Sequence, residues 1–164
     1  MFYKTISRLK FLLRATNQHG VHSPFVYDFV TKGLYKKENK VLDFKEYSAL
    51  KKLSKKEKKV FSKIVSYFKI DEIYSDFKTF SSNSDNNFKI LFINLIGKIK
   101  ISELNTLNSK HIIVVHGIYQ QKETTLKWRK IIKNKKATVS IDLYYFGLIF
   151  FRKEQVKEHF NIRV

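Results

Sequence analysis

Two unbroken runs of apolar residues constrain the fold of this chain more than any other feature. The first covers Lys89 to Leu95 (Lys-Ile-Leu-Phe-Ile-Asn-Leu), and the second covers His111 to His116 (His-Ile-Ile-Val-Val-His). Short runs of this kind are typical of strands buried on both faces, because successive side chains of a strand point to opposite sides. Helices that cover a parallel sheet on both sides provide that burial. We therefore expect an α/β fold in which 89–95 pairs in parallel with 111–116.

Helical patterns precede these strands. Phe2, Ile6, Leu9 and Leu13 recur at helical spacing, so residues 2–15 predict a basic amphipathic helix. A second helix is expected to begin at Ser23-Pro24, with serine as the N-cap and proline at the first position, and to end near Gly33. A third is expected over Phe44–Phe68 with a break near Leu53-Ser54, its lysines lying on the solvated side. The other predicted elements are a weak strand over 70–77, a polar loop over 81–87, helices over 101–107 and 123–133, strands over 137–145 and 148–152 that form an antiparallel hairpin around Phe146-Gly147, and an edge strand or tail over 160–164.

Length and composition indicate a single folded domain, with a helical region over 1–69 and a sheet region over 70–164. The 164 residues are 43% hydrophobic and include only one proline, which argues against disorder. The absence of cysteine excludes disulfides and thiolate metal sites, and it fits a cytoplasmic protein. Arg14 interrupts the apolar start of the chain, so no signal peptide is expected. The longest apolar run, 143–151, is too short for a transmembrane segment.

The formal net charge of +19 has two interpretations. A field of this size attracts polyanions such as nucleic acid or anionic lipid. The cations are mostly lysine, however, and abundant Lys, Asn, Ile and Phe is also the signature of a genome poor in G and C. Only five arginines are available for bidentate contacts with bases and phosphates, and they are scattered along the chain. A solvated basic surface and a functional polyanion-binding face through the lysine-rich helices both remain open.

Both ends of the chain carry recognisable motifs. Residues 17–30 include His19-Gly20-Val21-His22-Ser23-Pro24-Phe25, and residues 139–153 read Val-Ser-Ile-Asp-Leu-Tyr-Tyr-Phe-Gly-Leu-Ile-Phe-Phe-Arg-Lys. Together they resemble the beginning and end of a bacterial family of class I S-adenosylmethionine-dependent methyltransferases with an HGxHSPF motif. The resemblance covers residues 4–35 and 55–164. It implies a truncated Rossmann-like, mostly parallel sheet with N-terminal helices and a C-terminal antiparallel hairpin.

The middle of the chain departs from that family where the family binds its cofactor. The family's first strand runs into a glycine-rich turn that lets the backbone approach the ligand, whereas this chain has bulky residues and Asp76 within 74–80. Between Phe77 and Lys89 there is no room for the family's next two strands, the first of which ends in an acid that holds the ribose. Asn94 and His116 stand where the family has acidic residues. The resemblance thus implies a shortened, degenerate member that binds no S-adenosylmethionine, and it assigns no catalytic residue to this chain.

The remaining polar candidates have structural alternatives. His19, His22 and Ser23 are candidates for a metal or general-base site, but no acid or third ligand is spaced to match, and the turn can equally cap the second helix. We therefore expect no metal site. Trp128 is expected to be a packing anchor rather than a stacking platform for bases, and Asp142 a structural or solvent-facing carboxylate.

Three functions follow as expectations. The first is a methyltransferase-like protein without a cofactor that acts by binding a partner, either another protein, a second copy of itself or an anionic molecule. The second is an active S-adenosylmethionine-dependent methyltransferase with an unconventional site. The third is a basic nucleic-acid-binding module.

Overall fold

A six-stranded sheet forms the centre of the computed structural model, which describes residues 2–37, 41–82, 87–94 and 99–164. The strand order is β1-β2-β3-β5-β4-β6. Every strand except β5 runs in the same direction, because β5 is antiparallel to both of its neighbours. The strands are β1 (Ile73–Tyr74), β2 (Lys89–Ile93), β3 (His111–His116), β4 (Val139–Asp142), β5 (Phe146–Phe150) and β6 (Glu158–Asn161). The expected α/β class and mostly parallel sheet are therefore present.

The predicted pairing of the two apolar runs is confirmed. β2 pairs in parallel with β3, with Ile90 beside Ile112 and Phe92 beside Val114. All five residues of β2 are buried. The predicted antiparallel pairing of 137–145 with 148–152 is also confirmed, as β4 with β5.

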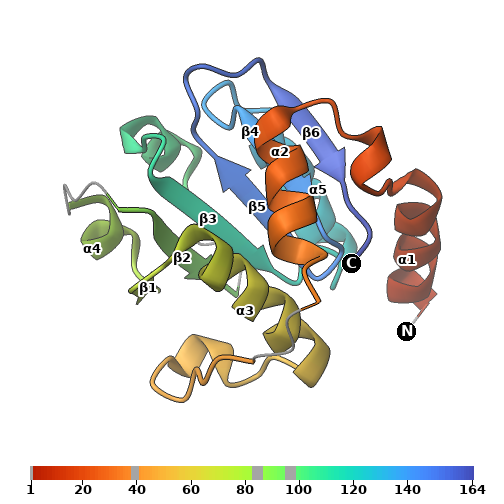
Figure 1. Cartoon of the computed structure of the whole chain (residues 1–164), viewed down its shortest axis with the longest axis horizontal. Coiled ribbons are helices and arrows are strands. Elements are labelled where there is room, and N and C mark those ends of the chain that lie inside the picture. The colour runs from red at the N-terminus through yellow and green to blue at the C-terminus, as the bar shows by residue number, and fades with distance from the viewer. Residues whose placement is uncertain (1, 38–40, 83–86, 95–98) are drawn as a thin grey trace.

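Helices cover both faces of the sheet, as Figure 1 shows. The front face carries α2 (Pro24–Asp28), a π-helical continuation (Phe29–Leu34) and α3 (Lys55–Phe68). The opposite face carries α5 (Lys122–Ile132), together with α4 (Phe77–Ser82) and a 3₁₀ helix (Ile101–Thr106). Phe61 of α3 packs on Phe92 of β2, while Trp128 of α5 is 1% exposed in the second core. The predicted packing role of Trp128 is confirmed.

The helix predicted over Phe44–Phe68 is wrong in its first part. Residues 41–47 are not helical; a single 3₁₀ turn (Ser48–Leu50) follows, and α3 begins only at Lys55. The Asp43 carboxylate accepts a hydrogen bond from the Lys45 amide, a local bond that competes with helix formation. The break near Ser54 is confirmed, since Ser54 and Glu57 form a reciprocal capping box that starts α3.

The strand predicted over 70–77 is also wrong in extent. Only Ile73 and Tyr74 pair with β2, and α4 begins at Phe77. The Asp76 carboxylate accepts hydrogen bonds from the amide and the hydroxyl of Thr79, so it turns the chain into a helix. Residues 83–86 of the predicted loop over 81–87 lie outside the described residues. The predicted helices over 101–107 and 123–133 are present as the 3₁₀ helix and α5. Leu126, whose apolar side chain would favour a place in the core, is instead 53% exposed.

The turn of the C-terminal hairpin lies at 143–145, and not around Phe146-Gly147 as expected. Gly147 is inside β5, where a Cβ would come within 2.5 Å of the Trp128 ring. The left-handed conformation in this turn belongs to Tyr144, with φ of 68°. That conformation is unfavourable for a residue with a side chain, so packing around Tyr144 must maintain it. The expected edge strand is β6, which begins earlier than predicted and pairs with β4.

The first helix, α1 (Phe2–Arg14), lies at the side of the sheet near β6 (Figure 1), and one of its faces adjoins α5. Its buried residues are Ser7 and Phe11. Phe11 packs against Tyr119 and Tyr144, with ring centroids 6.2 and 5.6 Å apart. Among the described residues, no helix combines the length and the apolar character that crossing a bilayer requires.

Candidate functional site

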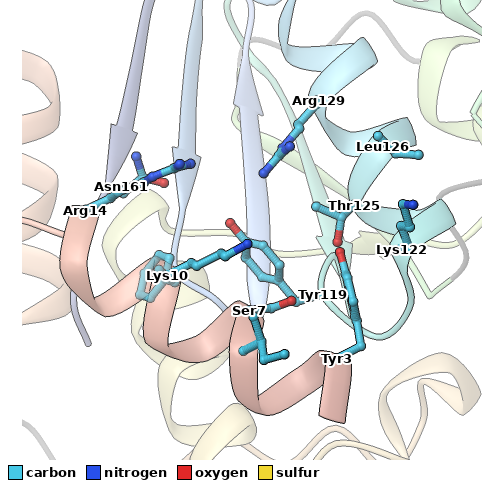
Figure 2. Close-up of a pocket in the computed structure, with 12 residues that line it drawn as sticks. Tyr3, Ser7, Lys10, Arg14, Tyr119, Lys122, Thr125, Leu126, Arg129 and Asn161 are labelled. Atoms are coloured by element: carbon cyan, nitrogen blue, oxygen red, sulfur yellow. The ribbon is translucent and has the colours of Figure 1, made fainter. Parts of the chain in front are cut away.

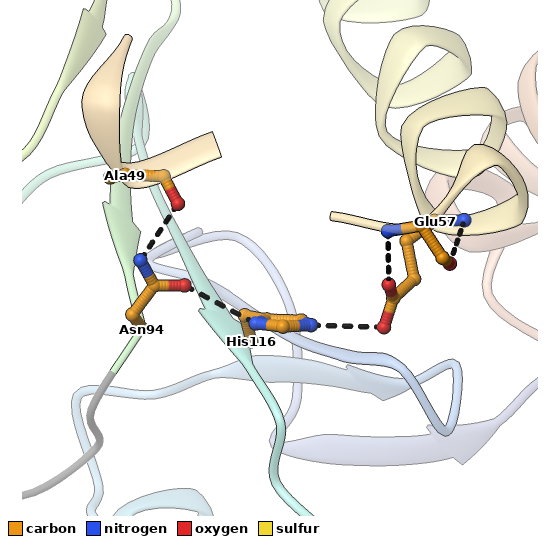
Figure 3. A network of polar contacts seen from close by, with 5 residues as sticks. Ala49, Glu57, Asn94 and His116 are labelled. Carbon is orange, nitrogen blue, oxygen red and sulfur yellow. Dashed lines mark hydrogen bonds and ion pairs between the residues drawn. The ribbon is translucent and has the colours of Figure 1, made fainter. Parts of the chain in front are cut away.

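Three polar side chains meet beyond the carboxyl ends of β2 and β3, as Figure 3 shows. Asn94 directly follows β2, His116 ends β3, and Glu57 lies in the first turn of α3. The His116 ring nitrogens lie 3.2 Å from Asn94 Oδ1 and 3.0 Å from Glu57 Oε1. Asn94 Nδ2 in turn donates to the Ala49 carbonyl at 2.8 Å. We call this chain of contacts, Ala49–Asn94–His116–Glu57, the edge network.

The geometry of the edge network defines its donors. The Ala49 carbonyl can only accept, so the amide nitrogen of Asn94 faces it and the Asn94 oxygen faces His116. The other side of the ring faces a carboxylate. Both ring nitrogens therefore meet acceptors, which is the arrangement that satisfies an imidazolium with two N–H donors.

Glu57 links the edge network to the start of α3. Its Oε2 accepts from the Ser54 amide at 2.7 Å, while its Oε1 faces His116. Burial raises the pKa of Glu57, but the hydrogen bonds from Ser54 and His116 outweigh burial and hold the pKa below its ordinary value. The His116 and Glu57 side chains are only 12% and 17% exposed, so their ion pair is largely shielded from solvent.

A cavity of about 500 Å³ lies beside the edge network, at the carboxyl ends of β1 and β2. Asn94 lines it together with Asp76, Phe77 and Glu103. The Asp76 carboxylate is exposed and is occupied by Thr79; this hydrogen bonding from the Thr79 amide and hydroxyl lowers the pKa of Asp76. Asp76 and Asn94 thus line the same cavity, whereas His116 contacts Asn94 from outside that cavity.

A second hollow, of about 310 Å³, lies on the other side of His116. Its aromatic walls come from Tyr119, Tyr144 and Tyr145, and its cations are Lys4 and Lys52. The rings of Tyr119 and Tyr144 are stacked, with centroids 5.2 Å apart and planes inclined by 14°. The site therefore joins α1, the segment before α3 and the β4–β5 turn. We call it the tyrosine hollow.

Asp142 lies beneath the tyrosine hollow and is 1% exposed, so the alternative of a solvent-facing carboxylate is wrong. Its carboxylate accepts from the Tyr119 hydroxyl at 2.5 Å and from the Tyr144 amide at 2.8 Å. Burial raises the pKa of Asp142 to about 6, and these hydrogen bonds oppose the rise. Burial and the nearby Asp142 charge likewise raise the pKa of Tyr119, which keeps the Tyr119 proton on the phenol.

The N-terminal candidates lie elsewhere. Ser23 caps α2 by accepting from the Val26 amide, and it also accepts from Gln155 in the β5–β6 connection. This connection is at the amino edge of the parallel strands, opposite to Asn94 and His116. His19 and His22 are both exposed. No group of three or more metal-ligating side chains occurs among residues 2–37, 41–82, 87–94 and 99–164.

Sequence reasoning placed Asn94 and His116 at strand ends but missed their partner Glu57 and the pair Tyr119–Asp142. The Ser54-x-x-Glu57 capping box was readable from the sequence as a helix start. Glu57 lies 59 residues before His116, and no local pattern connects them. Tyr119 lies 23 residues before Asp142, in a loop without a motif.

We expect replacement of Glu57 by glutamine to lower the free energy of unfolding at pH 7 by about 1–3 kcal/mol, because the buried imidazole loses its charged acceptor. The pKa of Glu57 is lowered in the fold, so its contribution is present above its unfolded pKa, about 4.3, and disappears as pH falls through the folded value. Urea unfolding at pH 7 and pH 3 measures both effects. Glu103→Gln is the matched control, since Glu103 also accepts a capping amide, from Lys100, but its carboxylate faces no histidine. Equal losses in the two variants would contradict the importance of the ion pair.

We expect Tyr119→Phe to destabilise the protein more at pH 7.5 than at pH 4.5. With its pKa raised to about 6, Asp142 favours the folded state when protonated, so its contribution to stability falls as pH rises through about 6. Above that pH the buried carboxylate depends on the Tyr119 hydroxyl, whose loss costs on the order of 1–3 kcal/mol. Chemical unfolding of the wild type, Tyr119→Phe and Asp142→Asn at both pH values measures this. In the Asp142→Asn background the effect of Tyr119→Phe should be the same at both pH values; a persistent pH dependence there would assign it to another group.

Comparison of the chain with protein-family models, with curated proteins and with solved structures finds no match in any of the three.

Proposed function

We propose that this protein is a reduced, Rossmann-like domain of class I methyltransferase type that no longer uses S-adenosylmethionine and acts by binding a partner. The edge network carries this proposal. In α/β folds, ligands bind beyond the carboxyl ends of the strands, and the polar groups there must be free to receive them. Here Asn94 and His116 are engaged with Ala49 and Glu57.

The connection after β1 supports the same proposal. A cofactor turn needs backbone amides that a ligand can approach, whereas this turn carries Phe77 and ends in the Asp76–Thr79 helix cap. The Phe77 ring packs against Phe80, which is buried. Among the described residues between this helix and β2, there is no strand whose terminal acid would hold a ribose. Interactions expected at two ends of the ligand are therefore missing.

One observation favours an active enzyme with an unconventional site instead. The cavity of about 500 Å³ at the ends of β1 and β2 is within the size range of small-molecule sites. It carries two carboxylates, Asp76 and Glu103, whose oxygens are able to accept hydrogen bonds from hydroxyl groups. Binding of the cofactor there is the outcome that would distinguish an enzyme from a binding module.

We expect calorimetric titration with S-adenosylmethionine, and with S-adenosylhomocysteine, to show no saturable binding at millimolar ligand. A dissociation constant above about 1 mM corresponds to less than about 4 kcal/mol of affinity. Circular dichroism on the same sample verifies that the protein is folded. A micromolar dissociation constant of the wild type, raised by the substitution Asp76→Asn, would establish the enzyme alternative.

A nucleic-acid-binding function is the second candidate, favoured by the cations around the tyrosine hollow. Lys4 and Lys52 line it, and the Lys56 ammonium lies 5.4 Å from the centroid of the Tyr145 ring. The basic side chains of α3 do not all converge here, since Lys63 donates to the Leu34 carbonyl and lines a separate hollow. A groove that combines cations with aromatic rings is typical of proteins that bind single strands.

If this second function holds, affinity for a fluorescent single-stranded oligonucleotide should fall steeply with salt, because each neutralised phosphate releases counterions. The double variant Lys4→Gln/Lys52→Gln should reduce the slope of log affinity against log salt by roughly 0.7 for each phosphate that the variant no longer neutralises. Lys136→Gln/Lys153→Gln, at the opposite edge of the sheet, is the charge-matched control. An unchanged slope in the double variant would exclude the tyrosine hollow as the binding site.

A further inference from the structure

Helix α1 presents its apolar face to solvent. Phe2, Ile6, Leu9 and Leu13 are 83%, 46%, 59% and 87% exposed, although their spacing is that of a core-facing stripe. The helix docks on the protein through the opposite face, which carries Ser7 and Phe11. An apolar stripe of four residues, turned away from the protein that carries it, is a surface that marks an interaction. We call these four residues the α1 stripe.

A basic groove adjoins the α1 stripe, between α1 and α5 (Figure 2). It has a volume of about 220 Å³. Four cations line it, Lys10 and Arg14 from α1 and Lys122 and Arg129 from α5, together with the hydroxyls of Tyr3 and Ser7. Figure 2 shows Lys10, Arg14 and Arg129 reaching toward the same space. No carboxylate lines the groove among the described residues.

The charges of the groove are not neutralised by the protein. Within the described part of the chain, none of its four cations forms an ion pair or a side-chain hydrogen bond. The acidic group that acts on Arg129 is Asp142, which is buried below Tyr119 and already accepts two hydrogen bonds. Four like charges around one hollow repel one another, so an anion placed there is stabilised by all of them. Arginine and lysine side chains are well suited to a phosphate group.

The groove and the α1 stripe form one continuous surface. Ile6 belongs to the stripe and also lines the groove, and across the groove it faces the side of α5 that carries the exposed Leu126. A ligand that is complementary to this surface must therefore present phosphate groups next to an extended apolar region. A helix with basic residues beside exposed Phe, Ile and Leu is typical of helices that lie in the headgroup region of a membrane.

We propose that α1 and the groove bind an anionic phospholipid surface, with a headgroup phosphate between the four cations and the α1 stripe inserted at the acyl boundary. The net charge of +19 is complementary to such a surface and draws the protein toward it. This interaction is independent of the cofactor question, because none of its residues belongs to the edge network. It holds the protein at a membrane surface through α1 and the groove.

The test is co-sedimentation of the full chain with vesicles of phosphatidylcholine alone and of phosphatidylcholine mixed with phosphatidylglycerol. We expect binding to the mixed vesicles, no binding to neutral ones, and loss of binding at high salt. Lys10→Gln/Arg129→Gln should weaken binding about fivefold per charge removed. Leu9→Gln/Leu13→Gln should weaken it by about tenfold while leaving the unfolding transition unchanged, because both side chains are exposed.

Matched controls separate this site from general charge and apolar exposure. Lys136→Gln/Lys153→Gln removes two exposed cations, and Val41→Gln/Val156→Gln removes two exposed apolar side chains (48% and 83% exposed), all outside α1 and the groove; neither pair should change vesicle binding. The proposal is overturned if these controls weaken binding as much as the groove and stripe variants do. It is also overturned if Leu9→Gln/Leu13→Gln binds mixed vesicles like the wild type. Complete displacement of the protein from these vesicles by a low concentration of inorganic phosphate or of an oligonucleotide would overturn it as well. So would a dimer in which a second copy covers the stripe and which Leu13→Gln dissociates.

Discussion

Burial of the sheet on both faces is the constraint on which the rest of this structure depends. Alternate residues of β2 enter two different cores, with Ile90 and Phe92 packing toward α3 and Leu91 and Ile93 toward α5. A strand in this position has no solvated face on which to place a polar side chain. Polar side chains that could bind a ligand or react are therefore restricted to the strand ends and to the connections that follow them. Asn94 and His116 lie there for this reason, one directly after β2 and the other at the last position of β3.

The edge network shows what this protein does with that position. The capping box of α3 already needs the Glu57 carboxylate, and the same carboxylate also meets His116, so one acid both starts a helix and attaches it to the sheet. An ion pair so shielded from water loses much of its solvation, and it persists only if each remaining polar atom has a partner. The Ser54 amide and the Asn94 side chain supply those partners. Groups arranged in this way stabilise the packing of one element on another, whereas a ligand site needs groups that are satisfied only when the ligand arrives.

The sequence was informative where a pattern is local and uninformative where two distant residues meet. The apolar runs of β2 and β3, the Ser23 cap and the break at Ser54 depend on neighbouring residues, and each was predicted. Gly147 was misleading, since a glycine between two strands predicts a turn, yet here its missing side chain makes room for Trp128 from another layer. The exposure of the α1 stripe likewise could not be predicted from the periodicity of its apolar residues. A helical repeat of apolar residues defines a face but does not say what that face contacts.

The location of charge matters more for this protein than its total. Several of its few acids are engaged within the fold: Glu57 with His116, Asp142 with Tyr119, Asp76 with Thr79. With 33 Lys and Arg against 14 Asp and Glu, the cations far outnumber the acids that could pair with them. In physiological salt, electrostatic interactions between exposed charges are screened beyond about 8–10 Å, so widely spaced lysines attract an anion separately. The α1–α5 groove brings four of them within one small hollow, and a surface phosphate there experiences all four charges together. An apolar stripe on the same helix then adds an attraction that salt does not screen. For this reason we propose this flank, rather than the more lysine-rich α3, as the surface through which the net charge selects a partner.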